Sequence, residues 1–357
     1  MIYLINILLI IIYGLFLLGY NTNSNKKKLF CILASLQWIL LSGLRDISIG
    51  ADTLSYKISF ERTKNLSWNF LVDRFNGIIF QGKEGKDPGY AFVEKFVQIF
   101  TDNYQIYLII IALIFTIPMG IFIYRYSKNA CLSFIIYSTL FFSFFAITGH
   151  RQTIVTGVAI FLGYELIKKK KFLLYCTIII LLMTVHKSVI CLIPFYFIAN
   201  KKITFKYCIS ILILFVIIFI FKNNVMKILA NTLGYEEFAN QYNGAGTWTF
   251  TLLFIVIILV SIWKRKIILK DNNKDITIWY NAMFLALLFI PLTFVDPNAM
   301  RLVQYFSIFI IVIIPEIVKS FNLKEQSLIY FLGISILIIL LAKQGLNYKF
   351  FWGGLNG

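Results

Sequence analysis

Apolar stretches recur along the whole chain, separated by short polar segments. A helix needs about 20 apolar residues to cross a hydrocarbon core of about 30 Å. Because lipid cannot hydrogen-bond the backbone, such stretches predict helices. We therefore expect an all-α polytopic membrane protein with about twelve transmembrane helices (range 10–13) in a single domain over residues 1–357. The predicted spans are 2–20, 29–44, 104–124, 130–148, 152–167, 172–186, 188–199, 206–221, 248–263, 277–295, 302–318 and 326–342.

Clusters of lysine and arginine between these stretches indicate the topology. The run Lys26 to Lys28 follows the first span, and further basic clusters follow every second span. The positive-inside rule places such clusters in the cytoplasm, which leaves both termini external. Segment 188–199 is short for a crossing and is alternatively re-entrant. Without it the later basic clusters would face outward, so we retain it as a crossing.

Two external loops are long. Residues 45–103 are polar and rich in glycine but also contain many aromatic residues, which favours an ordered lid over a linker. Within this loop, Tyr90 to Phe100 has apolar residues at helical spacing, which predicts an amphipathic helix lying on the membrane surface. The second external loop, 222–247, ends in Asn-Gly-Ala-Gly and is the lesser candidate for function.

Composition narrows the function classes. Hydrophobic residues make up 59% of the chain, against about 45–50% in soluble domains. The net charge of +18 comes from short clusters without a basic aromatic face, so we expect no nucleic-acid partner. The five cysteines and two histidines show no metal-ligand spacing, so we expect no metal and no cofactor. No phosphate-binding glycine loop or serine-hydrolase motif supports ATP-driven transport or serine hydrolysis.

Charged and titratable residues that sit at a membrane-spanning segment and are not cytoplasmic anchors all fall on the predicted external face. They are Arg45, Asp46, Asp52, His150, Arg151, His186, Lys187, Asp296 and Arg301. Arginine suits bidentate binding of phosphate, and histidine is the side chain most easily poised for proton transfer near neutral pH. The pattern predicts an enzyme with an external site for an anionic substrate.

Structural interpretations of the same residues stay open. Interfacial anchoring or packing would also account for Arg45, His150, Arg151 and His186. An ion pair would explain Asp296 and Arg301 as well as a cationic clamp does. Asp87, in a turn before the amphipathic segment, is either catalytic or a cap for the following helix.

The order and spacing of four motifs resemble the EpsG family, related in role to Wzy-type repeat-unit polymerases. The motifs are Arg45 with Ile49-Gly50-Ala51-Asp52-Thr53-Leu54-Ser55-Tyr56, then Asp87-Pro88-Gly89-Tyr90, Arg151-Gln152 and Val185-His186-Lys187-Ser188. The resemblance covers residues 40–200 well. Beyond them it consists of hydropathy and Arg301.

This resemblance implies a polymerase that joins polyprenyl-diphosphate-linked oligosaccharide repeat units at the outer face of the bacterial cytoplasmic membrane. The product would be capsule, exopolysaccharide or O-antigen, and the expected partners are membrane lipid, a chain-length regulator and a flippase. Glycan ligases or other external transferases, a flippase or exporter, and a scaffold are the alternatives.

Such a reaction assigns roles to the candidate residues. The leaving diphosphate gains negative charge as the glycosidic bond breaks, so fixed cations stabilise the transition state. The substrate-binding candidates are Arg45, Arg151, Arg301, Tyr56 and Lys187. The attacking sugar hydroxyl needs a proton acceptor. The catalytic candidates are Asp52, His186, His150 and Asp87.

Overall fold

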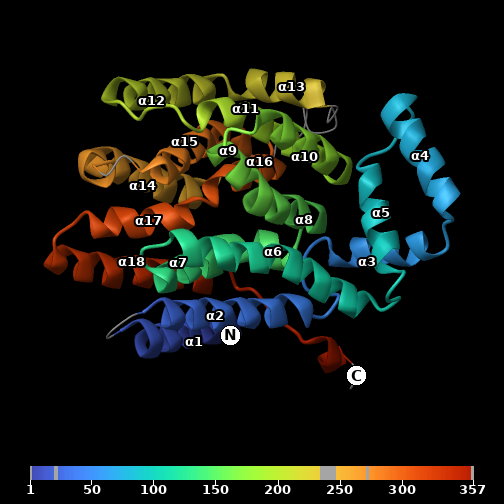
Figure 1. The fold of residues 1–357 in the computed structure, drawn as a ribbon, viewed down its shortest axis with the longest axis horizontal. Coiled ribbons are helices and arrows are strands. Elements are labelled where there is room, and N and C mark those ends of the chain that lie inside the picture. The colour runs from blue at the N-terminus through green and yellow to red at the C-terminus, as the bar shows by residue number, and fades with distance from the viewer. Residues whose placement is uncertain (1, 20–22, 234–246, 271–272, 355–357) are drawn as a thin grey trace. The chain divides into compact units, whose positions relative to one another are not determined.

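The computed structural model describes residues 2–19, 23–233, 247–270 and 273–354. These residues form 18 α-helices, joined in places by short 3₁₀ and π segments (Figure 1). The chain divides into two compact units, which we describe separately. Unit 1 comprises Met1–Leu166, Leu173–Lys187 and Tyr330–Gly357, and unit 2 comprises Ile167–Phe172 and Ser188–Ile329.

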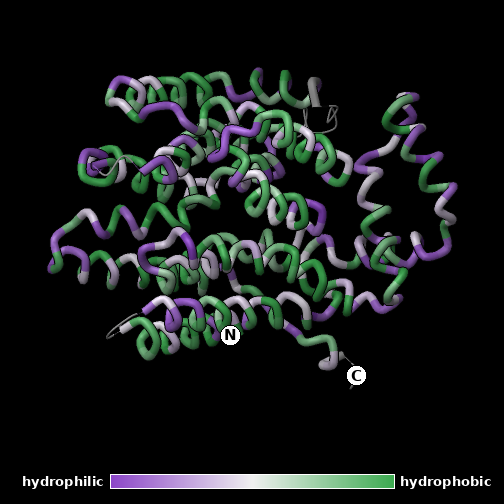
Figure 2. The backbone as a smooth tube through the Cα atoms, viewed as in Figure 1, coloured by the Kyte–Doolittle hydropathy of each residue, from purple (hydrophilic) through white to green (hydrophobic). Residues whose placement is uncertain are grey.

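Unit 1 contains the four motifs that carry the resemblance, except for Ser188, which belongs to unit 2. Its helices are α1 (Ile2–Leu18), α2 (Ser24–Gly43), α3 (Thr53–Lys64), α4 (Trp68–Phe80), α5 (Pro88–Val97), α6 (Tyr104–Tyr126), α7 (Ala130–Ile136), α8 (His150–Val158), the start of α9 (Tyr164–Lys168), α10 (Phe172–Val185) and most of α18 (Leu323–Lys343). Two π segments, Tyr137–Phe141 and Ser143–Ile147, extend α7, and a third, Ala159–Gly163, extends α8. Figure 2 shows hydrophobic residues along most of these helices, whereas α3 is largely polar.

The core of unit 1 forms where α2 packs along α6. A side chain at Gly43 would collide with Ile109, and one at Gly120 would collide with Ser35, so the two glycines permit the close approach of these helices. Trp38 is fully buried in this core and donates from Nε1 to Ser138 Oγ at 2.8 Å. This packing fixes the end of α2, where Arg45 follows.

The segment 45–103 is ordered, as the sequence predicts. It holds α3 and α4 as well as the expected amphipathic helix, which is α5. Phe92 of α5 packs against Trp68 and Phe75 of α4, with ring centroids 6.3 and 5.7 Å apart. Gln98 beyond α5 donates to the carbonyl of Phe60 on α3 at 2.6 Å. The description of this segment as a loop with one helix was therefore incomplete, because cross-contacts between α3, α4 and α5 stabilise two further helices.

The C-terminal segment of unit 1 packs against the end of α2. Phe350 forms an antiparallel bridge with Arg45, and the Asp46 amide donates to the Lys349 carbonyl at 2.8 Å. The Tyr348 hydroxyl donates to the Leu41 carbonyl at the same distance. No periodic pattern in the sequence indicates this contact, which joins residues about 300 positions apart.

Unit 2 is built around α15 (Lys274–Phe289). Its other helices are the end of α9, α11 (Leu192–Ile198), α12 (Phe205–Ile220), α13 (Lys222–Leu233), α14 (Trp248–Ile268), α16 (Met300–Ser307), α17 (Ile310–Lys319) and the start of α18. Asn281 of α15 is fully buried and donates to the carbonyls of Ala199 and Lys201, at 3.0 and 2.9 Å. Tyr280 donates to the Ser261 carbonyl of α14 at 2.7 Å. These bonds connect three segments of unit 2 through one helix.

The predicted external loop 222–247 is helical over its first half, and its external position stays a prediction. Residues Lys222–Leu233 form α13, in which Val225, Met226 and Leu229 pack against the cluster that includes Leu292 and Val295. The apolar spacing in this short segment was hidden by its asparagines and lysines. Residues 234–246 lie outside the described residues.

Three helical segments of the described chain are long and apolar enough to cross a membrane: Tyr104–Tyr126, Lys274–Phe294 and Leu323–Lys343. Two bent helix pairs raise this number to five if each pair is one span. These helices indicate a multi-pass membrane protein. The twelve spans, the external termini and the single domain stay predictions, and segment 188–199 forms a 3₁₀ turn followed by the seven-residue α11.

Candidate functional site

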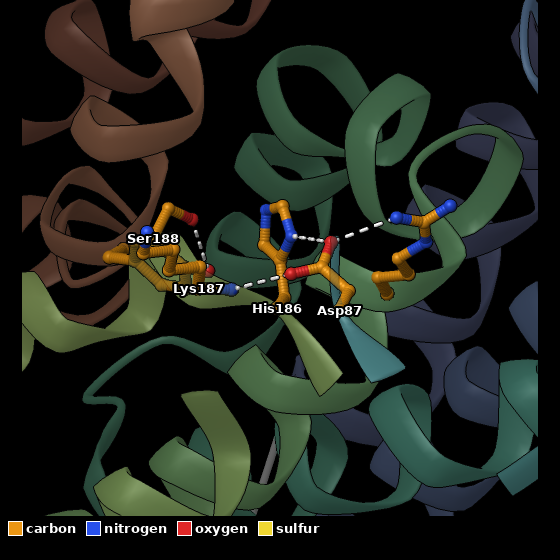
Figure 3. Close-up of polar contacts among 6 residues, drawn as sticks. Asp87, His186, Lys187 and Ser188 are labelled. Carbon is orange, nitrogen blue, oxygen red and sulfur yellow. Dashed lines mark hydrogen bonds and ion pairs between the residues drawn. The ribbon is translucent and has the colours of Figure 1, made fainter. Parts of the chain in front are cut away.

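Asp87 lies at the centre of a polar cluster in unit 1. It precedes α5 with φ 50° and ψ 54°, a left-handed conformation that is uncommon outside glycine. Its side chain makes no capping bond to α5, so the helix-cap interpretation is wrong. Instead, Oδ2 accepts from Arg151 Nη1 at 2.8 Å and lies 3.4 Å from His186 Nδ1, while Oδ1 accepts from the Lys187 amide at 3.0 Å (Figure 3).

The Asp87 side chain is only 5% exposed, yet its surroundings favour the charged form. Burial by itself would raise the pKa of this carboxyl. The hydrogen bonds from His186, Arg151 and the Lys187 amide outweigh burial, so the pKa of Asp87 lies below its usual value. At neutral pH Asp87 is therefore a carboxylate that only accepts hydrogen bonds.

The charge on Asp87 determines the tautomer of His186. Since a carboxylate has no proton to give, His186 Nδ1 must carry the hydrogen that points to Asp87. In the neutral ring the lone pair then lies on Nε2, which has no hydrogen-bond partner among the described residues. His186 ends α10, where the helix gives way to the 3₁₀ turn Lys187–Cys191. The carboxylate of Asp87 thus orients His186 as a possible general base.

Arg151 is held by rings as well as by Asp87. It is the second residue of α8, which begins after Gly149 in a left-handed conformation. Its guanidinium carbon lies 5.2 Å from the Tyr90 ring centroid and 5.7 Å from that of Tyr56. Cation–π contacts of this kind orient a guanidinium while leaving its edge accessible. The Arg151 side chain is 33% exposed.

A second cluster surrounds Arg45, next to the first. Arg45 is 2% exposed, and its guanidinium donates to the Ser42 carbonyl and to His150 Nε2, the latter at 3.0 Å. Because arginine has no acceptor, His150 Nε2 must provide the lone pair and its Nδ1 must carry the proton. The His150 ring stacks on Tyr56 with centroids 4.2 Å apart. Tyr56 thus contacts both clusters.

A pocket of about 320 Å³ in unit 1 lies beside Asp87 and Arg151. It is bounded by α3, α4, α5 and the turn before α5. Its cationic lining residues are Arg62, Arg74, Lys86 and Arg151. Four cations around one carboxylate make the pocket suitable for an anionic group. We call it the lid pocket.

Glu94 connects the wall of the lid pocket to α5. It is fully buried, and its Oε2 accepts from Thr63 Oγ1 at 2.8 Å and from Ser59 Oγ at 3.1 Å, both on α3. Burial raises the pKa of Glu94 to about 7, against the opposing effect of these two hydrogen bonds. The side chain is therefore a titratable contact between two lid helices near neutral pH.

The structure brings most of the predicted site residues together within unit 1. They are Arg45, Tyr56, Asp87, His150, Arg151, His186 and Lys187. Only the backbone of Lys187 makes one of these contacts, and the residue is exposed. Asp52 is half-buried, one helical turn before Tyr56, and its catalytic role stays a prediction.

The predicted residues of the C-terminal half belong to unit 2. Asp296 is buried and caps a 3₁₀ turn, accepting from the Asn298 amide at 2.8 Å. Arg301 is half-buried in the first turn of α16. A third arginine in the anion site stays a prediction.

Sequence reasoning missed the lid cations. Arg62, Arg74 and Lys86 lie in segment 45–103, where charges at a polar surface gave no reason to single them out. Glu94 lies on the polar side of the amphipathic segment Tyr90 to Phe100, and this side packs against α3 instead of facing water. The available signal was the helical spacing of α3, which places Ser59 and Thr63 one turn apart as possible donors to Glu94.

Comparison with known proteins gives one family match. The model of the EpsG family matches residues 28–353, which span both units. No curated protein and no solved structure matches the chain. The match covers far more than half of the chain and includes every motif on which the sequence resemblance rests. The protein therefore belongs to the EpsG family, a family linked to exopolysaccharide biosynthesis.

Proposed function

We propose that this protein is a polysaccharide polymerase that joins polyprenyl-diphosphate-linked oligosaccharide repeat units at the external face of the cytoplasmic membrane. The observation that supports the proposal most directly is the ionised Asp87, bonded to Arg151 and His186 and bordering a pocket lined by cations. A glycosyl transfer from a diphosphate needs a cation for the leaving group and a base for the acceptor, and this cluster offers both.

The cation in the proposal is Arg151. As the bond between the anomeric carbon and the diphosphate oxygen breaks, the electron pair passes to the diphosphate. A fixed guanidinium stabilises this charge more in the transition state than in the ground state. Asp87 and the rings of Tyr56 and Tyr90 hold Arg151 in place before the reaction, so little reorganisation is required.

The base in the proposal is His186. The acceptor hydroxyl attacks the anomeric carbon and gives its proton to Nε2, the nitrogen with the lone pair. Asp87 is a weak base because its pKa is lowered, and its part is to orient His186 and balance its positive charge. His150 is a poorer candidate since Arg45 occupies its lone pair. Asp52 is the alternative base.

Membrane embedding suits this chemistry because the polyprenyl tail stays in the bilayer while the sugars remain in water. The lid helices α4 and α5 carry exposed apolar side chains, including Phe70, Phe80 and Phe96, as expected of helices on a membrane surface. Repeat units would thereby reach the lid pocket from the side of the membrane.

The test uses a deletion strain complemented with wild type, Arg151→Ala or His186→Gln at matched membrane levels. Polymer length is measured together with the side of the membrane on which lipid-linked repeat units accumulate. The polymerase proposal requires single units on the outer leaflet and no long polymer. Arg125→Ala, which removes an exposed arginine paired with Glu165, is the matched control and keeps long polymer.

The rival functions give different results. Units held on the inner leaflet would indicate a flippase or exporter. Long polymer that is not attached to its final acceptor would indicate a ligase. Normal polymer from both site variants would place the reaction away from Asp87.

A further inference from the structure

The larger pocket of unit 1 lies among α1, α7 and α18 and has a volume of about 430 Å³. Most of its wall is apolar and includes Ile11, Leu15, Ile135 and Ile334. Ile135 is fully buried, whereas Leu15 is 71% exposed. Because α18 is one of the candidate membrane spans, a pocket with such an opening faces hydrocarbon rather than water. Its apolar part matches an acyl chain.

One end of this pocket is cationic. Lys27, from the first turn of α2, and Lys128, from the turn before α7, both line it. Lys27 Nζ donates one hydrogen to the Ser127 carbonyl at 2.7 Å, which leaves two of its three donors for a ligand. Burial lowers the pKa of Lys27, and the positive charge of Lys128 lowers it further. Two like charges at one end of a pocket repel, and a bound anion relieves the repulsion.

A hydroxyl group lies in the same pocket lining. Tyr330 of α18 accepts from Asn129 Nδ2 at 3.2 Å, so its own hydrogen is available to an acceptor. Asn129 Oδ1 accepts from the Leu132 amide at 3.0 Å and is therefore fixed. The lining thus offers two ammonium groups and a hydroxyl donor next to an apolar wall.

We propose that this pocket binds one anionic phospholipid, with the head-group phosphate on Lys27, Lys128 and Tyr330 and an acyl chain along α1, α7 and α18. The predicted topology places this end of the helices at the cytoplasmic leaflet, which carries anionic lipid. The site is separate from the Asp87 cluster and does not depend on the proposed polymerase activity. It would give the full-length protein a preference for membranes that contain anionic lipid.

The experiment measures lipid binding to the purified full-length protein by native mass spectrometry. Dioleoylphosphatidylglycerol is the anionic probe, and dioleoylphosphatidylcholine has the same chains without the net charge. We expect one phosphatidylglycerol to be retained in preference to phosphatidylcholine. In Lys27→Ala/Lys128→Ala its binding weakens about 25-fold, from about fivefold per lysine.

Two matched variants separate the pocket from bulk charge. Lys26→Ala/Lys28→Ala also removes two positive charges, both from the cluster that contains Lys27, but neither residue lines the pocket, so wild-type binding is expected. Lys27→Arg/Lys128→Arg keeps the charge at the pocket and keeps binding, which also controls for folding. Equal loss in both alanine pairs, or equal retention of the two lipids by wild type, would overturn the proposal.

A third outcome concerns the source of the phosphate. Undecaprenyl phosphate is added as a competitor at increasing ratio to phosphatidylglycerol. If undecaprenyl phosphate displaces half of the bound phosphatidylglycerol when it is present at the lower concentration of the two, it binds more tightly. The occupant is then a polyprenyl phosphate, and the phospholipid assignment is wrong. Weak competition supports the phospholipid.

Discussion

Two regions of unit 1 each join an arginine to a histidine, but they present these groups in opposite ways. Arg45 is 2% exposed and donates to a backbone carbonyl and to His150. The Arg151 side chain is 33% exposed, paired with Asp87 and adjacent to the lid pocket. Arg45 therefore makes its hydrogen bonds within the protein, whereas Arg151 is positioned to contact a ligand in the lid pocket.

The histidines differ in the same sense. The His150 Nε2 lone pair accepts a hydrogen bond from Arg45, whereas the His186 Nε2 lone pair stays available because Nδ1 carries the hydrogen and donates it to Asp87. Residue types alone would rank the two pairs equally. The hydrogen-bond partner of each side chain, rather than its residue type, therefore distinguishes a catalytic candidate from a structural residue.

The largest effect that would test this comparison is expected at Arg151. Arg151→Ala should reduce polymerisation by about 10²–10³-fold, as loss of one fixed charge-stabilising donor does in other enzymes. Arg151→Lys should restore only part of the rate, since an ammonium cannot form the same bidentate contacts. The rate is measured with lipid-linked repeat units and purified protein in bilayers. A loss below tenfold for Arg151→Ala would contradict the assignment.

A smaller loss, about 10²-fold, is expected for His186→Gln because one general base is removed. The rate is measured with lipid-linked repeat units, as for Arg151→Ala. His150→Gln is the matched comparison and should stay within about tenfold of wild type. If instead His150→Gln loses the rate and His186→Gln keeps it, the two histidines have been assigned the wrong roles.

Arg45 is expected to affect folding more than rate. Arg45→Ala leaves His150 without its donor in a buried site, which should lower stability by about 2–4 kcal/mol. The activity of each folded molecule should stay within about tenfold of wild type, well above that of Arg151→Ala. Thermal unfolding and activity normalised to folded protein measure both. A rate loss equal to that of Arg151→Ala at unchanged stability would remove the distinction between the two regions.

The smallest effect concerns the pH dependence of lid stability. With its pKa raised to about 7, Glu94 keeps its proton in the folded lid after an unfolded chain has lost it at about 4.3. The stabilisation is therefore complete below the unfolded pKa and is lost as the pH rises through about 7. Glu94→Gln cannot ionise and should flatten this decline.

The measurement is thermal unfolding of wild type and Glu94→Gln at a series of pH values between about 4.5 and 8. Glu61→Gln, which changes an exposed carboxylate of α3, is the matched control and should follow wild type. Parallel curves for wild type and Glu94→Gln would show that Glu94 does not titrate in this range.

Much of the architecture was predictable because hydrophobic periodicity reports helices directly. The ordered segment 45–103 followed from its aromatic residues, and α5 followed from local apolar spacing. The motifs also gave the family, which the match over residues 28–353 confirms. The additional helices α3, α4 and α13 did not follow, because their polar residues conceal apolar faces that become apparent only against their neighbours.

Hydrophobic periodicity was sufficient to give the helical class, and the order of the motifs was sufficient to give the family. Composition gave the residue types available for chemistry. The tertiary structure decided which of those residues meet. Asp87, Arg151 and His186 are separated by as many as 99 positions, and their contacts depend on how α5, α8 and α10 pack. The same packing buries Arg45, exposes the edge of Arg151 and sets the tautomer of each histidine, since hydrogen-bond partners come from distant segments that no local pattern specifies.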